Sequence, residues 1–120
     1  MSGMLFPKEG KRQRARKIHA KSSILQKDTD RRRCWLCMYI QHDYSEHAQG
    51  VLHKHHVYMG PLRNTSEEHG FYVYLCPQHH MRVHADAGIC RILQAQMQRE
   101  YERTHTRDEF IRLIGRSYLG

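Results

Sequence analysis

The sequence predicts a small α+β fold, in which a β-hairpin leads directly into a helix, with a basic arm before them and two helices after them. Two apolar runs, Val51–Tyr58 and Phe71–Leu75, have the composition of strands, and Pro77 stands where a helix begins. Cysteines and histidines gather around these runs, while Lys and Arg gather near the N-terminus. The predicted parts are an arm (1–33), a core (34–86) and a C-terminal helical part (87–120).

The chain is 120 residues long, which suits one domain with a small core. Only 39% of its residues are hydrophobic and its mean hydropathy is −0.81, so we expect a bound metal to support the core. The sequence has no apolar run of about 18 residues and no apolar N-terminal segment, so we expect neither a membrane span nor a secretory signal. An intracellular, cytoplasmic protein is expected, and spaced cysteines in such proteins bind metal more often than they pair.

The net charge of +8 is concentrated in the arm. Residues 1–33 contain eleven Lys and Arg against three acidic residues, whereas nine of each balance in residues 34–120. A basic arm on a neutral body favours nucleic-acid binding through phosphate contacts, and the alternative is a solvated tail. The residues expected to contact nucleic acid are Arg12, Arg14, Arg16, Arg31, Arg32 and Arg33 from the arm, with Lys54 and Arg82 from the core.

Before the hairpin, regular structure is expected to be sparse. Ser23–Gln26 is predicted to be a short strand or a tie between arm and body, and Cys34–Cys37 is predicted to be a turn. The polar stretch Tyr39–Gln49 is predicted to be a loop.

The hairpin is predicted to consist of the two apolar runs and an elaborated loop. In that loop, Asn64–Gly70 has the pattern of a single capped helical turn closed by Gly70. A helix is then predicted from Pro77 to about Ala85.

Two C-terminal helices are predicted to complete the core. The first runs from Ile89 to about Arg103, and a capping box of Thr106 and Glu109 opens the second. An alternative is that these helices form a surface for a protein partner or a homodimer. The predicted apolar positions are Ile89, Ile92, Leu93, Met97 and Tyr101 in the first helix, and Phe110, Ile111, Leu113, Ile114 and Tyr118 in the second.

Two ligand pairs have the spacing of a structural zinc site. Cys34 and Cys37 form one x-x pair, and Cys76 and His79 form the other at the start of the predicted helix. Structural zinc takes four sulfur or nitrogen ligands in a closed tetrahedron. Cys90 is an alternative to His79 as the fourth ligand, and ordinary buried thiols are the alternative to a metal site.

A second ligand cluster is made of histidines. Nine of the eleven histidines lie between His42 and His84, and neutral imidazole is both a metal ligand and a base near neutral pH. His80 and His84 are four residues apart, so they share a helix face, while His79 points elsewhere. Three histidines around a divalent ion leave positions open, which is the catalytic rather than the structural arrangement.

The segments Leu52-His-Lys-His-His56 and Leu75-Cys-Pro-Gln-His-His80-x-x-x-His84 resemble the HNH endonucleases of the ββα-metal superfamily, in particular the small HNH proteins common in phages and prophages. The resemblance covers about residues 34–85. It implies that His55, His80 and His84 bind a catalytic Mg²⁺, Mn²⁺, Ni²⁺ or Zn²⁺ ion. It implies that His56 is the general base. It places the zinc knuckle on Cys34, Cys37, Cys76 and His79, with His79 where a cysteine is commoner.

This chain departs from the HNH pattern at the central Asn. The expected region, Gly70–Tyr72, contains no Asn, and the nearest is Asn64 in the loop. Asn64 is therefore the candidate for the supporting role of that residue.

The roles of His55 and His56 are open to exchange. In a regular strand the two face opposite sides, with His53 on the face of His55, so both reach one site only if the chain bends. His53 is expected to lie beside the metal or in solvent rather than to bind it.

The function expected from these patterns is metal-dependent endonuclease activity that nicks nucleic acid, DNA rather than RNA. The alternative is a zinc-stabilised module that binds nucleic acid or protein and whose nuclease site has degenerated.

Overall fold

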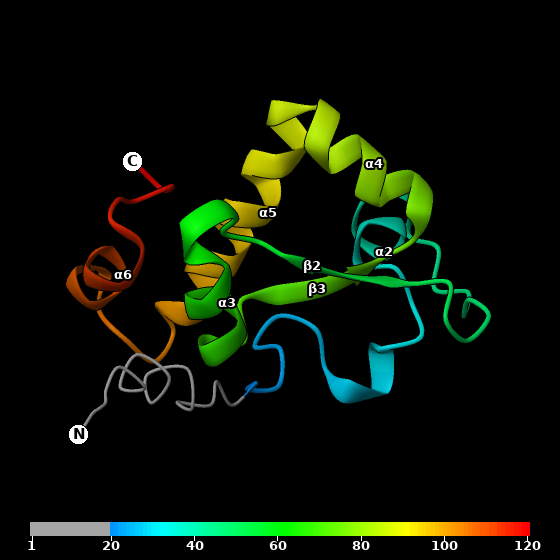
Figure 1. The fold of residues 1–120 in the computed structure, drawn as a ribbon, viewed down its shortest axis with the longest axis horizontal. Helices are drawn as coiled ribbons and strands as arrows, with labels where there is room; N and C mark the ends of the chain where they lie inside the picture. The colour runs from blue at the N-terminus through cyan, green and yellow to red at the C-terminus, as the bar shows by residue number, and fades with distance from the viewer. Residues whose placement is uncertain (1–19) are drawn as a thin grey trace, which may run out of the picture.

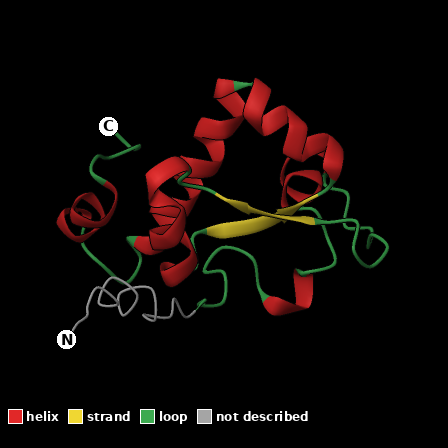
Figure 2. Cartoon of the chain, in the orientation of Figure 1, coloured by secondary structure: helices red, strands yellow, loops and turns green. Residues whose placement is uncertain are grey.

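The computed structural model describes residues 20–120, so Arg12, Arg14, Arg16 and the rest of 1–19 lie outside the described residues. The fold is α+β, as predicted, with one two-stranded antiparallel sheet and helices around it (Figures 1 and 2). Within residues 20–120, no helix is both long and apolar enough to cross a membrane. In chain order the elements are η1 (Asp28–Asp30), α2 (Trp35–Gln41), β2 (His53–His56), η2 (Gly60–Leu62), α3 (Arg63–His69), β3 (Tyr72–Leu75), α4 (Pro77–Ala85), α5 (Ala87–Tyr101) and α6 (Arg107–Ile114).

The pairing of β2 with β3 sorts the hairpin side chains onto two faces. His55 is opposite Val73 and His56 is opposite Tyr72, and residues directly opposite each other share a face. One face therefore carries His53, His55, Val73 and Leu75, and it contacts α4. The other face carries Lys54, His56, Tyr72 and Tyr74, and Glu67 of α3 pairs with two of these.

The strand-to-helix corner predicted at Pro77 is present, with α4 bounded as expected. Pro77 occupies the first helical position, where its missing N–H leaves no hydrogen bond unmade. The side chain of Asp86 then caps α5 by accepting from the backbone N–H groups of Gly88 and Ile89. One short connection thus joins α4 to α5, and the two helices run apart from that corner (Figure 1).

The core joins the hairpin to every α-helix around it except α3. Leu36, Val73, Val83, Leu93 and Phe110 are at most 2% exposed and come from α2, β3, α4, α5 and α6 in turn. The two C-terminal helices therefore contribute to the same core as the hairpin. Two of the predicted apolar positions, Ile92 and Ile111, are exposed. The prediction was also wrong in placing Tyr118 on the last helix, because Gly115 ends α6 in a left-handed conformation.

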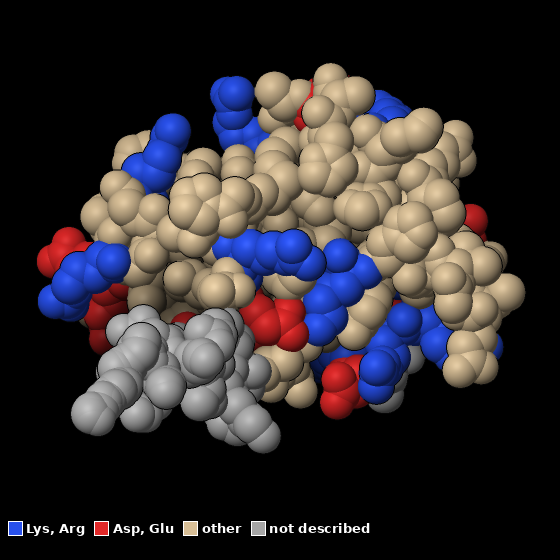
Figure 3. All heavy atoms as spheres, viewed as in Figure 1, with Lys and Arg blue, Asp and Glu red and all other residues tan. Residues whose placement is uncertain are grey.

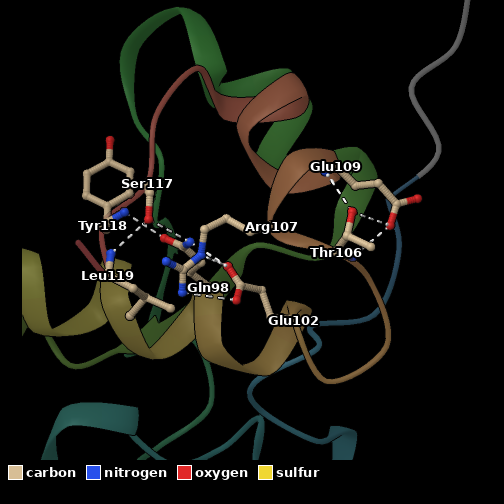
Figure 4. Close-up of polar contacts among 8 residues, drawn as sticks. All are labelled: Gln98, Glu102, Thr106, Arg107, Glu109, Ser117, Tyr118 and Leu119. Carbon is tan, nitrogen blue, oxygen red and sulfur yellow. Dashed lines mark hydrogen bonds and ion pairs between the residues drawn. The ribbon is translucent and has the colours of Figure 1, made fainter.

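Polar contacts fix α6 and the C-terminal segment against α5 (Figure 4). Gln98 is fully buried, and its side-chain oxygen accepts from the backbone N–H of Tyr118 at 2.7 Å while its amide donates to Glu102 and Ser117. The predicted capping box of Thr106 and Glu109 is present. These contacts satisfy the buried amide, so its burial need not destabilise the fold.

The segment after Cys34 is helical, which corrects the predicted turn and loop. The Sγ atom of Cys34 accepts from the backbone N–H of Cys37 and so caps α2. The helix buries Trp35 and Leu36, and it ends at His42, whose φ of 55° is left-handed. Residues 43–50 contain no regular element. The helix was missed because its buried side chains are confined to its first turn.

Ser23–Gln26 is a tie and not a strand. The Ser23 hydroxyl donates to the carbonyl oxygen of Tyr72 at 2.6 Å. The backbone N–H of Ile24 donates to the carbonyl oxygen of Gly70 at 3.0 Å. The buried Gln26 donates to two carbonyls ahead of α2 and accepts from the backbone N–H of Tyr74 at 2.7 Å. The segment is thereby held along the outer edge of β3.

The hairpin strands are shorter than predicted, and the helix between them is longer. β2 stops at His56, while Val57 and Tyr58 turn into the core. α3 spans seven residues rather than one turn, and it ends at Gly70 as predicted. Gly70 has φ 75°, and a Cβ there would collide with the backbone oxygen of Ser22, so the tie and this turn require glycine.

Candidate metal centres

Four buried side chains converge where α2 and α4 begin. Cys34 and Cys37 come from the start of α2, and Cys76 and His79 come from the corner between β3 and α4. Nδ1 of His79 lies 3.5, 3.4 and 3.5 Å from the Sγ atoms of Cys34, Cys37 and Cys76. Bond lengths of about 2.3 Å to sulfur and about 2.0 Å to nitrogen put a tetrahedral S···N edge near 3.5 Å. The group can therefore hold a structural metal such as zinc.

Without a metal, the thiols of this group stay protonated and its imidazole stays neutral. Burial raises the pKa of Cys34, and burial with repulsion from Cys34 raises the pKa of Cys37 to about 12. Burial lowers the pKa of His79, which keeps the ring neutral. A bound cation compensates for the cost of ionising such thiols, so binding releases protons. Cys90, the alternative ligand, lies on α5 against the core and outside this group.

Three histidines form a second, more open group on the other side of the β3–α4 corner. His55 comes from β2, and His80 and His84 come from one face of α4. Nε2 of His80 lies 3.4 Å from Nε2 of His84, and the three ligand atoms lie within 4.8 Å of one another. A tetrahedral N···N edge at metal–nitrogen distances of about 2.0 Å is near 3.3 Å. The structure thus brings together the three predicted ligands at spacings that suit one ion.

The buried member of this group lacks a hydrogen-bond partner. His55 is 3% exposed, and its Nε2 atom has no partner among residues 20–120. Burial, followed by the nearby rings of His80 and His84, lowers the pKa of His55 to about 4. A neutral, unpartnered nitrogen beside two other imidazoles is the state that a metal ligand requires.

His53 lies against the three-histidine group without belonging to it. Its Nδ1 atom is 3.0 Å from Nδ1 of His80, on the side of the ring away from His84. If Nδ1 of His80 is the donor in this contact, its Nε2 atom holds the lone pair that a metal would take. This placement agrees with a supporting position for His53.

His56 faces away from the three histidines, because the strand does not bend between His55 and His56. Nε2 of His56 lies 2.6 Å from Oε1 of Glu67, and Oε2 of Glu67 accepts from Lys54 at 3.0 Å. Burial raises the pKa of Glu67, but the hydrogen bonds from His56 and Lys54 outweigh it and hold that pKa below its ordinary value. An ionised carboxylate accepts only, so Nε2 carries the proton and Nδ1 of a neutral His56 holds the lone pair.

Beside this carboxylate–histidine pair lies a surface hollow of about 450 Å³. Asn64 lines the hollow but makes no hydrogen bond with His56, so Glu67 and not Asn64 contacts the imidazole. The sequence analysis missed Glu67 and Arg63. Their i, i+4 spacing on one face of a two-turn α3 is the signal that could have found them.

The predicted nucleic-acid contacts fall into two groups. Arg33 is held by Asp30, Glu46 and the carbonyl oxygen of Tyr44, so its role here is structural. Arg82 lies 3.8 Å from Asp86 on the exposed side of α4. Arg31, Arg32 and Lys54 line surface hollows, although Arg32 also lies 3.8 Å from Glu46 and Lys54 3.0 Å from Glu67.

Comparison of the chain with protein-family models, with curated proteins and with solved structures gives no match. Its function must therefore be inferred from the geometry of its own residues.

Proposed function

We propose that this protein is a metal-dependent nuclease that hydrolyses phosphodiester bonds of nucleic acid, DNA rather than RNA, at the group formed by His55, His80 and His84. The observation that carries the proposal is the buried Nε2 atom of His55, which lacks a partner among the described residues and lies beside two imidazoles at ligand spacing. The order of two strands and a helix that supplies these ligands is also that expected from the HNH resemblance.

The three imidazoles would hold the ion. A divalent ion such as Mg²⁺, Mn²⁺, Ni²⁺ or Zn²⁺ supplies Lewis-acid stabilisation of the charge that develops on the phosphate and leaving oxygens. The cysteine-rich group on the other side of the corner keeps β3 and α4 in place, and so sets the positions of His80 and His84.

His56 would act as the general base. Consecutive strand residues point to opposite faces, so a phosphodiester would meet both the bound ion and His56 only by passing around the edge of β2. Nδ1 of His56 takes a proton from water as the water oxygen bonds to phosphorus and the bond to the 3′ oxygen breaks. The 3′ oxygen takes a proton from solvent, which leaves 5′-phosphate and 3′-hydroxyl ends.

Glu67 and Lys54 would support this step. Glu67 holds the imidazole of His56 and stabilises its positive charge after proton transfer, as a carboxylate does for a catalytic histidine. Lys54 shares the same carboxylate and presents its ammonium beside His56 for a phosphate oxygen. Glu67 thus takes the supporting place for which Asn64 was the candidate.

The second candidate function is a zinc-stabilised module that binds nucleic acid without cleaving it. The observation that favours it is the turn of His56 away from the three-histidine group and its 2.6 Å contact with Glu67. In that case the chain binds nucleic acid and leaves it intact with every divalent ion.

The two candidates are separated by plasmid nicking with each of the four ions. We expect the wild type to nick, and we expect His56→Ala and His80→Ala to lose nicking while retaining the fold and one zinc. Met81→Ala is the matched control on α4, because Met81 is 69% exposed and belongs to neither ligand group. Equal nicking by wild type and His56→Ala would remove His56 as the base, and no nicking with any ion would leave the binding module.

A further inference from the structure

The hairpin face that carries His56 is also the floor of a groove. Tyr72 and Tyr74 lie on this face with Lys54 and His56. At one end stands α3 with Arg63, and along the edge of β3 runs the segment of residues 20–33, held by Ser23 and Gln26. The walls are therefore fixed by hydrogen bonds to the hairpin itself.

Three surface hollows follow one another along this face. The first, of about 450 Å³, is lined by Lys54, His56 and Arg63. The second, of about 200 Å³, is lined by Tyr72, Tyr74 and Arg31. The third, of about 460 Å³, again includes Tyr74 and Arg31. The second and third hollows share Arg31 and Tyr74, and Nζ of Lys54 in the first hollow lies 4.3 Å from the ring centre of Tyr72 in the second, so the three are neighbours on the surface.

The surface along these hollows is strongly basic. Six Lys and Arg line the three hollows against two acidic residues, Asp28 and Glu67. Figure 3 shows Lys and Arg gathered over the hairpin and, lower in the same view, over the segment before α2. Arg31 and Arg63, at opposite ends, make no ion pair with any residue of 20–120, which leaves both guanidinium groups available for a ligand. The six basic residues are Lys21, Lys27, Arg31, Arg32, Lys54 and Arg63.

We propose that this groove binds the sugar-phosphate backbone of the nucleic acid, which runs from Arg63 past His56 and Lys54 to Arg31 and Arg32. The proposal rests on the proposed function and adds the path of the substrate to it. The four paired residues of the hairpin span about 13 Å. That length matches about four nucleotides of a duplex at about 3.4 Å each, so backbone contacts on both sides of the scissile bond are expected.

A groove that binds backbone reads no bases. Phosphate contacts fix the position of a nucleic acid and carry no direct sequence information. Tyr72 is 6% exposed and its hydroxyl donates to the carbonyl oxygen of Lys21, so its ring is not free to stack on a base. The chain is therefore expected to bind nucleic acids of different sequence with similar affinity.

The test is the salt dependence of binding, measured by fluorescence anisotropy with short single- and double-stranded DNA. All proteins carry His80→Ala, so that cleavage does not interfere. Arg31→Gln with Arg63→Gln removes two charges from the ends of the groove. Arg99→Gln with Arg112→Gln is the matched control, because it removes two exposed charges from α5 and α6.

We expect the groove pair to lower the slope of log affinity against log salt by about 1.8 on duplex, or about 1.4 on a single strand. The control pair should leave the slope unchanged, and Arg31→Lys with Arg63→Lys should restore it. That restoration separates lost charge from damaged folding, which zinc content and melting temperature also report.

Equal slopes for the groove pair and the control pair, or no binding of either DNA, would overturn the groove. The two proposals fail differently. Nicking by the wild type with equal slopes would refute the groove alone, whereas a changed slope without nicking would refute the nuclease alone.

Discussion

The two ligand groups stand on either side of one strand-to-helix corner and differ in how they meet solvent. In the cysteine-rich group all four ligands are buried. In the histidine group one ligand is buried, one is partly exposed and His84 is exposed. Neighbouring residues of α4, His79 and His80, belong to different groups because about 100° of helical rotation separates them.

Under the proposed function, this difference would separate a scaffold role from a chemical role. A closed set of four ligands leaves no position for water or substrate, whereas three ligands with an exposed side leave one. The closed group ties α2 to the β3–α4 corner, far apart in sequence. The open group meets solvent through His84, while the pair formed by His56 and Glu67 lies on the opposite face of the hairpin. Under the proposed function, the same corner would provide both stability and an accessible ion.

The largest expected effect is the loss of the closed group. Cys34→Ser should prevent the protein from folding stably, because a structural zinc contributes on the order of 10 kcal/mol and a whole domain is stable by about 5–15 kcal/mol. Circular dichroism and zinc content measure the result. Cys90→Ser, which changes a thiol outside the group, is the matched control and should fold normally. Cooperative unfolding of Cys34→Ser at the wild-type temperature would contradict the scaffold role.

Loss of the open group should spare the fold. His80→Ala should bind a second divalent ion at least tenfold more weakly than the wild type, since one of three ligands is gone, while its melting temperature stays within a few degrees. Isothermal titration with Mn²⁺ or Ni²⁺ measures the affinity. A variant that unfolds like Cys34→Ser would show that both groups are structural.

Lowering the pH should destabilise the fold through His55, the buried residue of the open group. In the unfolded chain His55 titrates near its ordinary pKa of about 6.5, whereas burial and the nearby His80 and His84 lower its pKa to about 4 in the folded chain. The unfolded state then binds more protons between these values. The stability that neutral His55 provides is complete above pH 6.5 and falls as the pH drops toward 4.

The expected loss from His55 is about 2 kcal/mol between pH 7 and pH 5, with the open group free of metal. Urea unfolding of the wild type and of His55→Gln, each loaded with one zinc, isolates this contribution. The stability difference between the two proteins should change by that amount. A difference that does not change with pH would show that His55 is not buried as described.

The smallest expected effect concerns Glu67. Glu67→Gln should slow single-turnover nicking by about tenfold, because groups that orient a reacting residue contribute less than the residue itself. Glu68→Gln removes the same charge from the same helix and is the matched control. A Glu67→Gln rate equal to that of the control would remove Glu67 from the mechanism.

Local signals in the sequence predicted much of this arrangement. The x-x spacing, the i, i+4 pair and Pro77 each depend on neighbours in sequence, and the structure brings both predicted ligand sets together. The alternation of a regular strand already placed His55 and His56 on opposite faces. The expected bend that would have joined them at one site is not present.

What the sequence did not reveal depends on packing. α2 buries few residues beyond its first turn, so its apolar pattern is too short to identify a helix. The role of Glu67 could not be predicted from the sequence, because it depends on how α3 packs against the hairpin. That packing brings the carboxylate of Glu67 to Lys54 and His56. The hydrogen bond from the backbone N–H of Tyr74 to the side-chain oxygen of Gln26 likewise joins residues 48 positions apart.

The central claim is that one corner holds two ions with different roles, and counting bound metal by native mass spectrometry tests it most directly. The wild type, saturated with zinc, should carry two ions, and the double variant His80→Ala with His84→Ala should carry one and remain folded. A wild type that binds a single ion, or a folded double variant that still binds two, would contradict the account.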